Sequence, residues 1–311
     1  MTGAEPLTSG GRVPNPEPRA PSTASVWVQA ARPKTLWASV APVVVGTAMA
    51  YGDGGFHWPS AAVALTCALL IQIVANFAND LFDFEKGADT ERRQGPVRVT
   101  HAGWVTPVAM RRATLGVMVF LVLGGLYLVW RGGWPIALIG IFSVIAGLLY
   151  TGGPYPLGYM GLGDVLVLIF FGPVAVAGTY YVQTLSVSAA VLVAGLAPGF
   201  LSVAILTVNN LRDMEEDGTT GKKTLVVRFG RGFACVEYVL AIVLACFLPL
   251  AIYLAWGQHG YSVAAAAVVF LAIPAFRKVC TDTGPALNPV LASTAQLLLV
   301  YSVIFSVGWI I

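Results

Sequence analysis

The stretch NNLRDMEEDGTTGKKTLVVR, residues 209–228, places four acidic side chains in five positions directly after a long apolar run. The chain as a whole has the composition of a membrane protein, because 57% of its 311 residues are hydrophobic and only 11% are charged. Its mean hydropathy of +0.77 is well above that of a water-soluble domain. Charge is costly to bury in a bilayer, so these acids need a reason to lie at the end of a membrane span.

Hydropathy predicts an all-α polytopic membrane protein with about nine transmembrane helices. A helix crosses the hydrocarbon core with ~20 apolar residues. The tail 1–24, rich in Pro, Gly and Ser, is predicted to be a disordered cytoplasmic segment, and 25–311 to form one transmembrane domain. The predicted spans are Leu36–Tyr51, Ser60–Phe82, Ala113–Trp130, Pro135–Tyr150, Asp164–Val182, Val187–Arg212, Phe233–Trp256, Tyr261–Phe276 and Pro289–Ile311.

The basic residues predict the orientation of these spans. Lys and Arg accumulate in cytoplasmic loops. With the N-terminus inside, only Arg131 of the 18 Lys and Arg residues falls on the outer side, and the outer connections are short. We therefore expect a multi-pass protein of the inner (cytoplasmic) cell membrane, with its N-terminus and its active-site loops in the cytoplasm.

An internal repeat pairs the opening stretch with an earlier one. NDLFDFEKGADTERRQGPVR, residues 79–98, aligns with 209–228 at an offset of 130, and seven of the twenty positions are identical. This offset contains four spans, so the two parallel pseudo-repeats end on the same side and are expected to face each other across a central cavity. Helical spacing places on one face Asn76, Asn79, Asp80 and Asp83 of the first copy, and Asn209, Asp213 and Glu216 or Asp217 of the second.

The chemistry of the two motifs indicates a metal ion and a phosphate. Several carboxylates that converge on a low-dielectric cavity need a compensating cation. Oxygen ligands of this kind suit Mg²⁺, which is often completed by phosphate oxygens. Basic side chains beside the acids would bind the remaining phosphate charge. The constellation therefore predicts a diphosphate of a lipid-soluble alcohol as the ligand, held by Arg92, Arg93, Arg98, Lys222, Lys223 and Arg228.

From about Trp27 onward the chain resembles the UbiA superfamily of intramembrane aromatic prenyltransferases. Members carry an Asn-Asp-x-x-Asp element after the second span and a second Asp-rich element after the sixth, where NDLFD (79–83) and DMEED (213–217) fall. The segments NDLFDFEKGAD, GPVR, YTGGPYPLGYMGLGD and GKKTLVVRFG are most similar to the 1,4-dihydroxy-2-naphthoate polyprenyltransferases of menaquinone synthesis. The resemblance implies nine helices around a central cavity that binds Mg²⁺, a polyprenyl diphosphate and an aromatic acceptor within the bilayer, and no nucleic acid.

The resemblance also implies roles for individual residues. Metal-assisted loss of diphosphate would give an allylic cation near Tyr150, Tyr155 or Phe82. The dihydroxynaphthoate ring, oriented through its carboxylate by Arg98 or Arg228, would attack and lose CO₂ to give demethylmenaquinol. The implied Mg²⁺ ligands are Asn79, Asp80, Asp83, Asp213 and Asp217, of which the four aspartates are the catalytic residues; Asp89 departs from the spacing of the family's third acid. The implied substrate-binding residues are Asn76, Asn79, Arg92, Arg93, Arg98, Tyr150, Asn209, Lys222, Lys223 and Arg228.

Other functions fit less of the pattern. A secondary transporter also uses internal repeats and buried acids, but its site lies near the bilayer midplane rather than at one interface. A CDP-alcohol phosphotransferase needs a D-x-x-D-G-x-x-A-R signature, which the sequence lacks. Within the superfamily the competing acceptors are 4-hydroxybenzoate, homogentisate, haem and glycerol phosphate. Asp164, in GLGD, is either a helix N-cap or a substrate contact.

Overall fold

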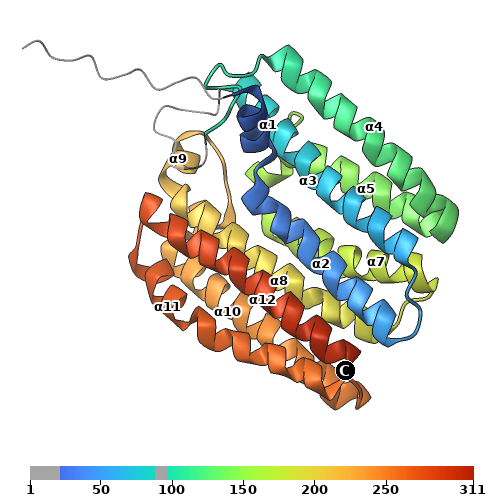
Figure 1. Cartoon of the computed structure of the whole chain (residues 1–311). Helices are drawn as coiled ribbons and strands as arrows, with labels where there is room; N and C mark the ends of the chain where they lie inside the picture. Colours follow the sequence, from blue (N-terminus) through green and yellow to red (C-terminus); the bar gives the residue numbers. More distant parts are fainter. Residues whose placement is uncertain (1–21, 88–94, 96) are drawn as a thin grey trace, which may run out of the picture.

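The computed structural model describes residues 22–87, 95 and 97–311, and this part of the chain is helical, with no strand (Figure 1). Nine of the described segments are long and apolar enough to cross a membrane, as hydropathy predicts. They are Pro33–Gly52 (α2), Trp58–Glu85 (α3), Pro107–Gly132 (α4), Trp134–Thr151 (α5), Gly163–Thr184 (α6, η2 and α7), Ala189–Arg212 (α8), Leu225–Trp256 (α10), Gly260–Thr281 (η3 and α11) and Gly284–Ile310 (η4 and α12).

Two helices begin well before the predicted spans. α10 begins at Leu225 instead of Phe233, because Thr224 caps it by accepting a hydrogen bond from the backbone N–H of Val227 at 3.2 Å. α4 begins at Pro107, again behind a capping threonine. Hydropathy marks only the apolar part of a helix, so it misses a first turn that carries charge and extends beyond the bilayer.

Two short helices at one end of the bundle were not predicted. Thr23–Ala31 (α1) is capped by Ser22, so it includes two residues that the sequence assigned to the tail; residues 1–21 lie outside the described residues. Met214–Thr219 (α9) follows α8 directly and carries the second acidic cluster. In Figure 1, α1 and α9 lie at the same end of the bundle, and the C-terminus lies at the other.

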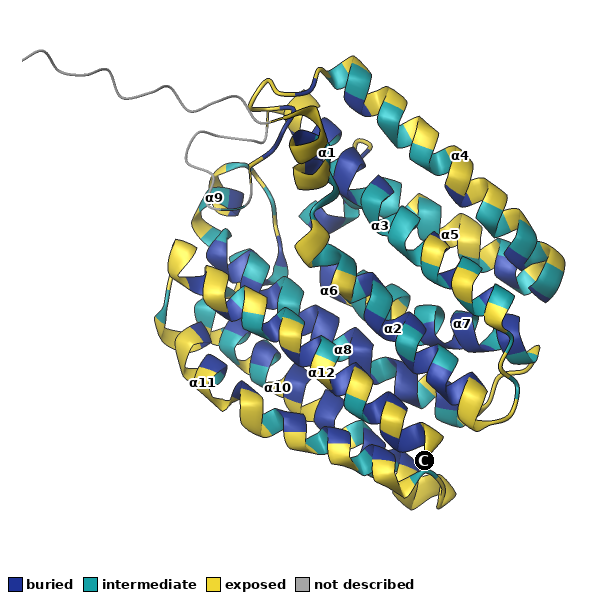
Figure 2. Cartoon of the chain, viewed as in Figure 1, coloured by how far each residue is buried: buried dark blue, intermediate teal, exposed yellow. Residues whose placement is uncertain are grey.

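α8 forms the centre of the packing. In an apolar 18-residue stretch of α8, 56% is buried inside the bundle. The corresponding share is 11% in α4 and in α5, which present most of their surface to lipid. Figure 2 shows this difference as dark blue along α8 and yellow along the outer face of α4. α8 contacts α10, α12 and the broken helix formed by α6, η2 and α7.

Glycines allow the broken helix to lie directly on α8. A Cβ atom at Gly199 would lie 2.5 Å from the carbonyl oxygen of Leu168 and 3.1 Å from the Cα atom of Gly172. Gly195 meets the backbone of Pro173 in the same way, at 2.7 Å. The small-xxx-small spacing of Gly195 and Gly199 is typical of closely packed membrane helices.

At the far end of the bundle, one carboxylate joins three helices through hydrogen bonds. Asp53, at the end of α2, accepts a hydrogen bond from the hydroxyl of Tyr180 at 2.7 Å and from the indole N–H of Trp309 at 3.2 Å. These bonds join α2, α7 and α12. The opposite end carries the predicted motifs.

The close contact between α8 and the broken helix predicts a position-specific loss of stability. Gly199→Leu forces a side chain against the backbone of Leu168, and we expect the free energy of unfolding in detergent to fall by ~1–3 kcal/mol or more. Gly116→Leu is the matched control, because nothing lies within 4 Å of a Cβ atom added at Gly116. Thermal denaturation of the purified variants compares them; equal midpoints would contradict the packing described for α8.

Candidate functional site

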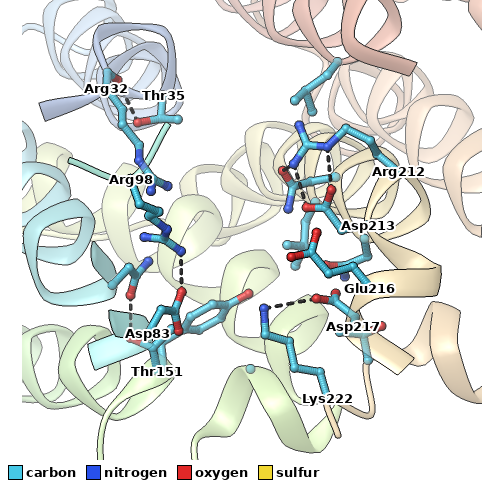
Figure 3. Close-up of a pocket in the computed structure, with 18 of the residues that line it drawn as sticks. Arg32, Thr35, Asp83, Arg98, Thr151, Arg212, Asp213, Glu216, Asp217 and Lys222 are labelled. Atoms are coloured by element: carbon cyan, nitrogen blue, oxygen red, sulfur yellow. Dashed lines mark hydrogen bonds and ion pairs between the residues drawn. The ribbon is translucent and has the colours of Figure 1, made fainter. Parts of the chain in front are cut away.

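A cavity of about 420 Å³ lies at the α9 end of the bundle, between the ends of α3, α5 and α8 and the start of α2. Figure 3 shows acidic side chains from two walls of this cavity facing each other. Tyr150, Leu206 and Leu291 supply aromatic and apolar lining. Among the described residues the charged lining consists of five basic side chains and four acidic ones, which are Arg32, Lys34, Arg98, Arg212 and Lys222, and Asp83, Asp213, Glu216 and Asp217.

The first acidic motif reaches the cavity from the last turns of α3. Asn79 accepts a hydrogen bond from the hydroxyl of Thr151 at 2.6 Å through its side-chain oxygen. Asp83 pairs with Arg98 through Oδ2 and accepts a hydrogen bond from the hydroxyl of Tyr159 at 2.9 Å through Oδ1. The Asp83 and Arg98 side chains are only 3% and 6% exposed, so this is a buried ion pair.

The second motif is organised by Arg212, whose role the sequence did not indicate beyond the positive-inside pattern. Its guanidinium donates to both carboxylate oxygens of Asp213, at 2.7 and 2.6 Å, in the bidentate arrangement that makes such pairs strong. It also donates to the side-chain oxygens of Asn209 at 2.9 Å and Asn288 at 3.2 Å. One buried arginine thus holds the end of α8 against the start of α12.

Asp217 lies one helical turn further on, in α9. Its carboxylate is buried and lies 3.0 Å from the Nζ atom of Lys222. Burial raises the pKa of Asp217 above its ordinary value, and the neighbouring charge of Lys222 opposes that shift. The second motif therefore pairs two of its acids, Asp213 and Asp217, with side-chain cations.

Tyr159 joins the two motifs, and the sequence did not single it out among the tyrosines of its loop. It lies in the short helix Leu157–Met160 (η1). Its hydroxyl donates to Asp83, and its ring lies 5.2 Å from the Nζ atom of Lys86 and 5.1 Å from that of Lys222. Burial, with the adjacent Asp83 charge, raises the pKa of Tyr159, so the phenol stays protonated and can donate.

Asp80 and Asn76, which the sequence predicts to lie in the site, are not among the residues that line this cavity. Asp80 is 1% exposed and accepts hydrogen bonds from the backbone N–H groups of Val99 and Thr100 at 3.1 and 3.0 Å. Asn76 donates to the turn between α1 and α2. A one-residue step rotates a side chain by ~100° around a helix, so Asp80 points to the loop while Asn79 points to the cavity.

Lys223 and Arg228 also lie outside the cavity lining. Both are exposed. The backbone N–H of Lys223 donates to the carbonyl of Tyr159 at 2.8 Å, and Arg228 donates to the carbonyls of Lys223 and Met160 at 2.9 and 2.8 Å. They fix the η1 loop, from which Tyr159 reaches the site.

The remaining predicted residues fall into three groups: some line the cavity, some lie near it, and some lie outside the described residues. Tyr150, Asn79 and Asn209 line the cavity, whereas Tyr155 is 76% exposed and, like Phe82, does not. Asp164 lies in the first turn of α6, where the N-cap position is occupied by Leu162, so Asp164 is not the N-cap of this helix. Arg92, Arg93 and Asp89 lie outside the described residues.

The contacts of Asp80 predict a measurable change in a specific pair of amides. Asp80→Asn replaces one acceptor oxygen by an NH₂ group that faces a backbone N–H. Loss of one charge-assisted hydrogen bond costs ~1.5–3 kcal/mol, so we expect the amide hydrogens of Val99 and Thr100 to exchange ~10- to 100-fold faster. Hydrogen-exchange mass spectrometry measures this, with Glu85→Gln, an exposed position five residues along α3, as the control. Unchanged protection in Asp80→Asn would contradict the anchoring role.

Comparison with known proteins places these features in a family. The UbiA prenyltransferase family matches residues 39–305. A 1,4-dihydroxy-2-naphthoate octaprenyltransferase from Haemophilus influenzae is 35% identical over 298 residues, which cover 92% of this chain and 96% of that protein. One of the same name from Mycobacterium tuberculosis is 40% identical over 232 residues, covering 72% of this chain and 79% of that protein.

The fold has been seen in a solved structure. A UbiA homologue from Archaeoglobus fulgidus, solved with GPP and Mg²⁺, superposes with a TM-score of 0.63 over 90% of this chain and 99% of that one, at 14% identity. At this identity the likeness concerns the fold alone, and it agrees with the helical bundle described above. The match to the family extends over most of the chain and includes both acidic motifs. The chain therefore belongs to the UbiA prenyltransferase family.

Proposed function

We propose that this membrane protein transfers a polyprenyl chain from a polyprenyl diphosphate to 1,4-dihydroxy-2-naphthoate, with release of diphosphate and CO₂, to give demethylmenaquinol. The observation that carries the proposal is a cavity that combines paired acids and an excess of basic side chains at the end of an apolar bundle. Such a cavity suits a ligand with a multiply charged head and a lipid-soluble tail. The names of the relatives, which match over most of their lengths, support the naphthoate acceptor.

The donor's diphosphate would lie among the basic side chains of the cavity. Arg98 and Arg212 offer planar guanidinium groups, which bind phosphate oxygens in pairs, and Lys222 offers a point charge. The prenyl chain would extend past Leu206 and Leu291 toward the bilayer interior. Prenyl transfer must exclude water from the allylic carbon, and an apolar wall serves that need.

The donor set of the cavity fits Mg²⁺, although no three carboxylate, His or Cys side chains of the described residues already form a metal site. Carboxylate and amide oxygens are hard ligands, and Mg²⁺ accepts a few of them together with water and phosphate oxygens. Asp83 with Asn79 and Asp213 with Asp217 would hold the metal. Asp80 does not line the cavity, and its carboxylate would instead anchor the backbone of Val99 and Thr100. When bound, Mg²⁺ would stabilise the negative charge that develops on the departing diphosphate.

The chain's own residues would then position the two reactants. The bond between the allylic carbon and the diphosphate oxygen breaks, and the ring carbon that bears the carboxyl group forms the new bond to that carbon. Loss of the carboxyl group as CO₂ returns its electron pair to the ring, so no external proton or oxidant is needed. The rings of Tyr150 and Tyr159 line the cavity and can stabilise the allylic cation. Of the two arginines predicted to orient the carboxylate of the acceptor, Arg98 lines the cavity and Arg228 does not.

The distribution of basic residues supports a cytoplasmic site. Arg131 lies at the far end of α4, where it donates to the carbonyl of Gln183. The cavity end carries the basic residues of the α3–α4, α8–α10 and α11–α12 connections among the described residues. By the positive-inside rule, this distribution supports the proposal that the cavity and the N-terminus lie in the cytoplasm.

A panel of acceptors tests the substrate assignment. Membranes that contain the protein are supplied with a polyprenyl diphosphate, Mg²⁺ and one of 1,4-dihydroxy-2-naphthoate, 4-hydroxybenzoate or homogentisate. We expect a prenylated, decarboxylated product from the naphthoate alone, identified by mass. Product from 4-hydroxybenzoate and none from the naphthoate would show that the acceptor is wrong.

The acids of the two motifs are expected to be required for turnover. Asp83→Asn and Asp213→Asn each remove a negative charge from the proposed metal site, and we expect kcat to fall at least ~100-fold while the protein remains folded. Chelation of divalent ions should abolish activity in the wild type. Glu85→Gln is the matched control, because Glu85 pairs with Arg111 at the exposed surface outside the cavity. Full activity in either aspartate variant or in chelator contradicts the assignment.

A further inference from the structure

The oxygen atoms proposed to bind metal already have partners within the chain. Each of Asn79, Asp83, Asp213 and Asp217 has at least one side-chain oxygen engaged by a donor of the protein. In Asp83 and Asp213 both carboxylate oxygens are engaged. The donors are Thr151 for Asn79, Arg98 and Tyr159 for Asp83, Arg212 for Asp213, and Lys222 for Asp217.

Three of these donors are the cations proposed to bind the diphosphate. Arg98, Arg212 and Lys222 each contact a carboxylate, and Figure 3 shows the three pairs around the cavity. The Arg212 and Asp213 side chains are 2% and 15% exposed, and the other two pairs are also largely withdrawn from water. A metal ion or a phosphate that binds these side chains therefore competes with the contacts that they make with each other.

We propose that divalent metal and diphosphate enter this cavity by an exchange of ionic partners. The carboxylates pass from the side-chain cations to the metal, while the cations pass from the carboxylates to the phosphate oxygens. The inference rests on the proposed function, because it takes a prenyl diphosphate and a divalent ion as the ligands.

The exchange follows from the cost of an unpaired buried charge. A metal ion that arrives alone takes the carboxylates, and the Arg212 guanidinium, which is 2% exposed, is then left without the carboxylate that pairs with it. The metal ion also adds positive charge to a cavity whose described lining already has one more basic than acidic side chain. A diphosphate that arrives alone leaves the carboxylates unpaired and brings further negative charge beside them. Only joint arrival leaves every charge with a partner.

The exchange makes the two ligands bind cooperatively. Coupling of two ligands on one protein is reciprocal, so each must tighten the other by the same factor. Couplings of this kind are typically ~5- to 150-fold, and with two buried arginine pairs involved we expect ~10- to 100-fold.

The test measures binding rather than turnover. Purified protein in nanodiscs is titrated with Mn²⁺, followed by electron paramagnetic resonance, with and without a non-reactive prenyl S-thiolodiphosphate; a protein-free titration corrects for Mn²⁺ bound by the analogue in solution. Retention of the analogue on the protein at several Mn²⁺ concentrations gives the reciprocal factor. We expect both factors to agree at ~10- to 100-fold. Equal Mn²⁺ affinity with and without the analogue would overturn the exchange.

Variants of the cations identify the competing partners. In Arg98→Met and Lys222→Met one carboxylate loses its internal cation, so Mn²⁺ alone should bind more tightly than in the wild type and the coupling factor should fall. Lys222 is the more exposed of the two, so its variant keeps the test open if Arg98→Met does not fold. Arg131→Met, at the far end of the bundle, is the matched control and should keep both wild-type values. Unchanged binding of Mn²⁺ alone in the cation variants would also overturn the exchange.

Acceptor turnover measured in parallel separates this inference from the proposed function. Chelator-sensitive prenyl transfer together with independent binding of metal and analogue would sink the exchange and leave the function standing. Coupled binding without transfer to any aromatic acceptor would support the exchange and sink the function.

Discussion

The pairing of buried carboxylates with neighbouring cations is the interaction on which the charged end of the bundle depends. Asp83 and Asp213 lie at the ends of helices that continue into the bilayer, where an unpaired charge is expensive. Arg98 comes from the loop after α3 and Arg212 from α8 itself, so each acid is neutralised by a residue close to it in sequence. Because the cations are supplied locally, these two acids are compensated within their own motif and not by the motif across the cavity.

The surrounding structure holds these pairs in place. Asp80 accepts hydrogen bonds from the backbone N–H groups of Val99 and Thr100, the two residues that follow Arg98, and thereby helps to fix where this guanidinium lies. The η1 loop is held by the backbone of Lys223 and by Arg228, and it delivers Tyr159 to the gap between the motifs. Some residues that look like ligands in the sequence thus position the residues that line the cavity. Asn79 and Asp80 are adjacent in α3, yet Asn79 lines the cavity and Asp80 binds the backbone of the loop.

Local patterns predicted the fold and only part of the site. Hydropathy depends on each segment alone, so it located the nine spans, and the repeated acids located the charged end. Which face of α3 meets the cavity is set by how its neighbours pack, and periodicity alone grouped Asp80 with Asp83. Arg212 and Tyr159 were missed for the same reason. In the sequence, Arg212 cannot be told from other cytoplasmic arginines, because its contact with Asn288 forms only when α8 packs against α12. Tyr159 cannot be told from the exposed Tyr155, because the fold of the η1 loop decides which of them reaches the cavity.

An internally paired cavity also suits chemistry that water would interrupt. Carboxylates left open at a membrane interface would recruit water and stray cations, and both would have to be expelled when the substrate arrives. Paired as they are, the acids and cations solvate one another, so the polar end of the cavity needs little water of its own. The ionic partners that a substrate must displace are then fixed parts of the protein. The cost of breaking these ion pairs is offset when a divalent ion binds the carboxylates and a clustered negative charge binds the cations. The pairing therefore favours a metal-bound diphosphate over other ligands.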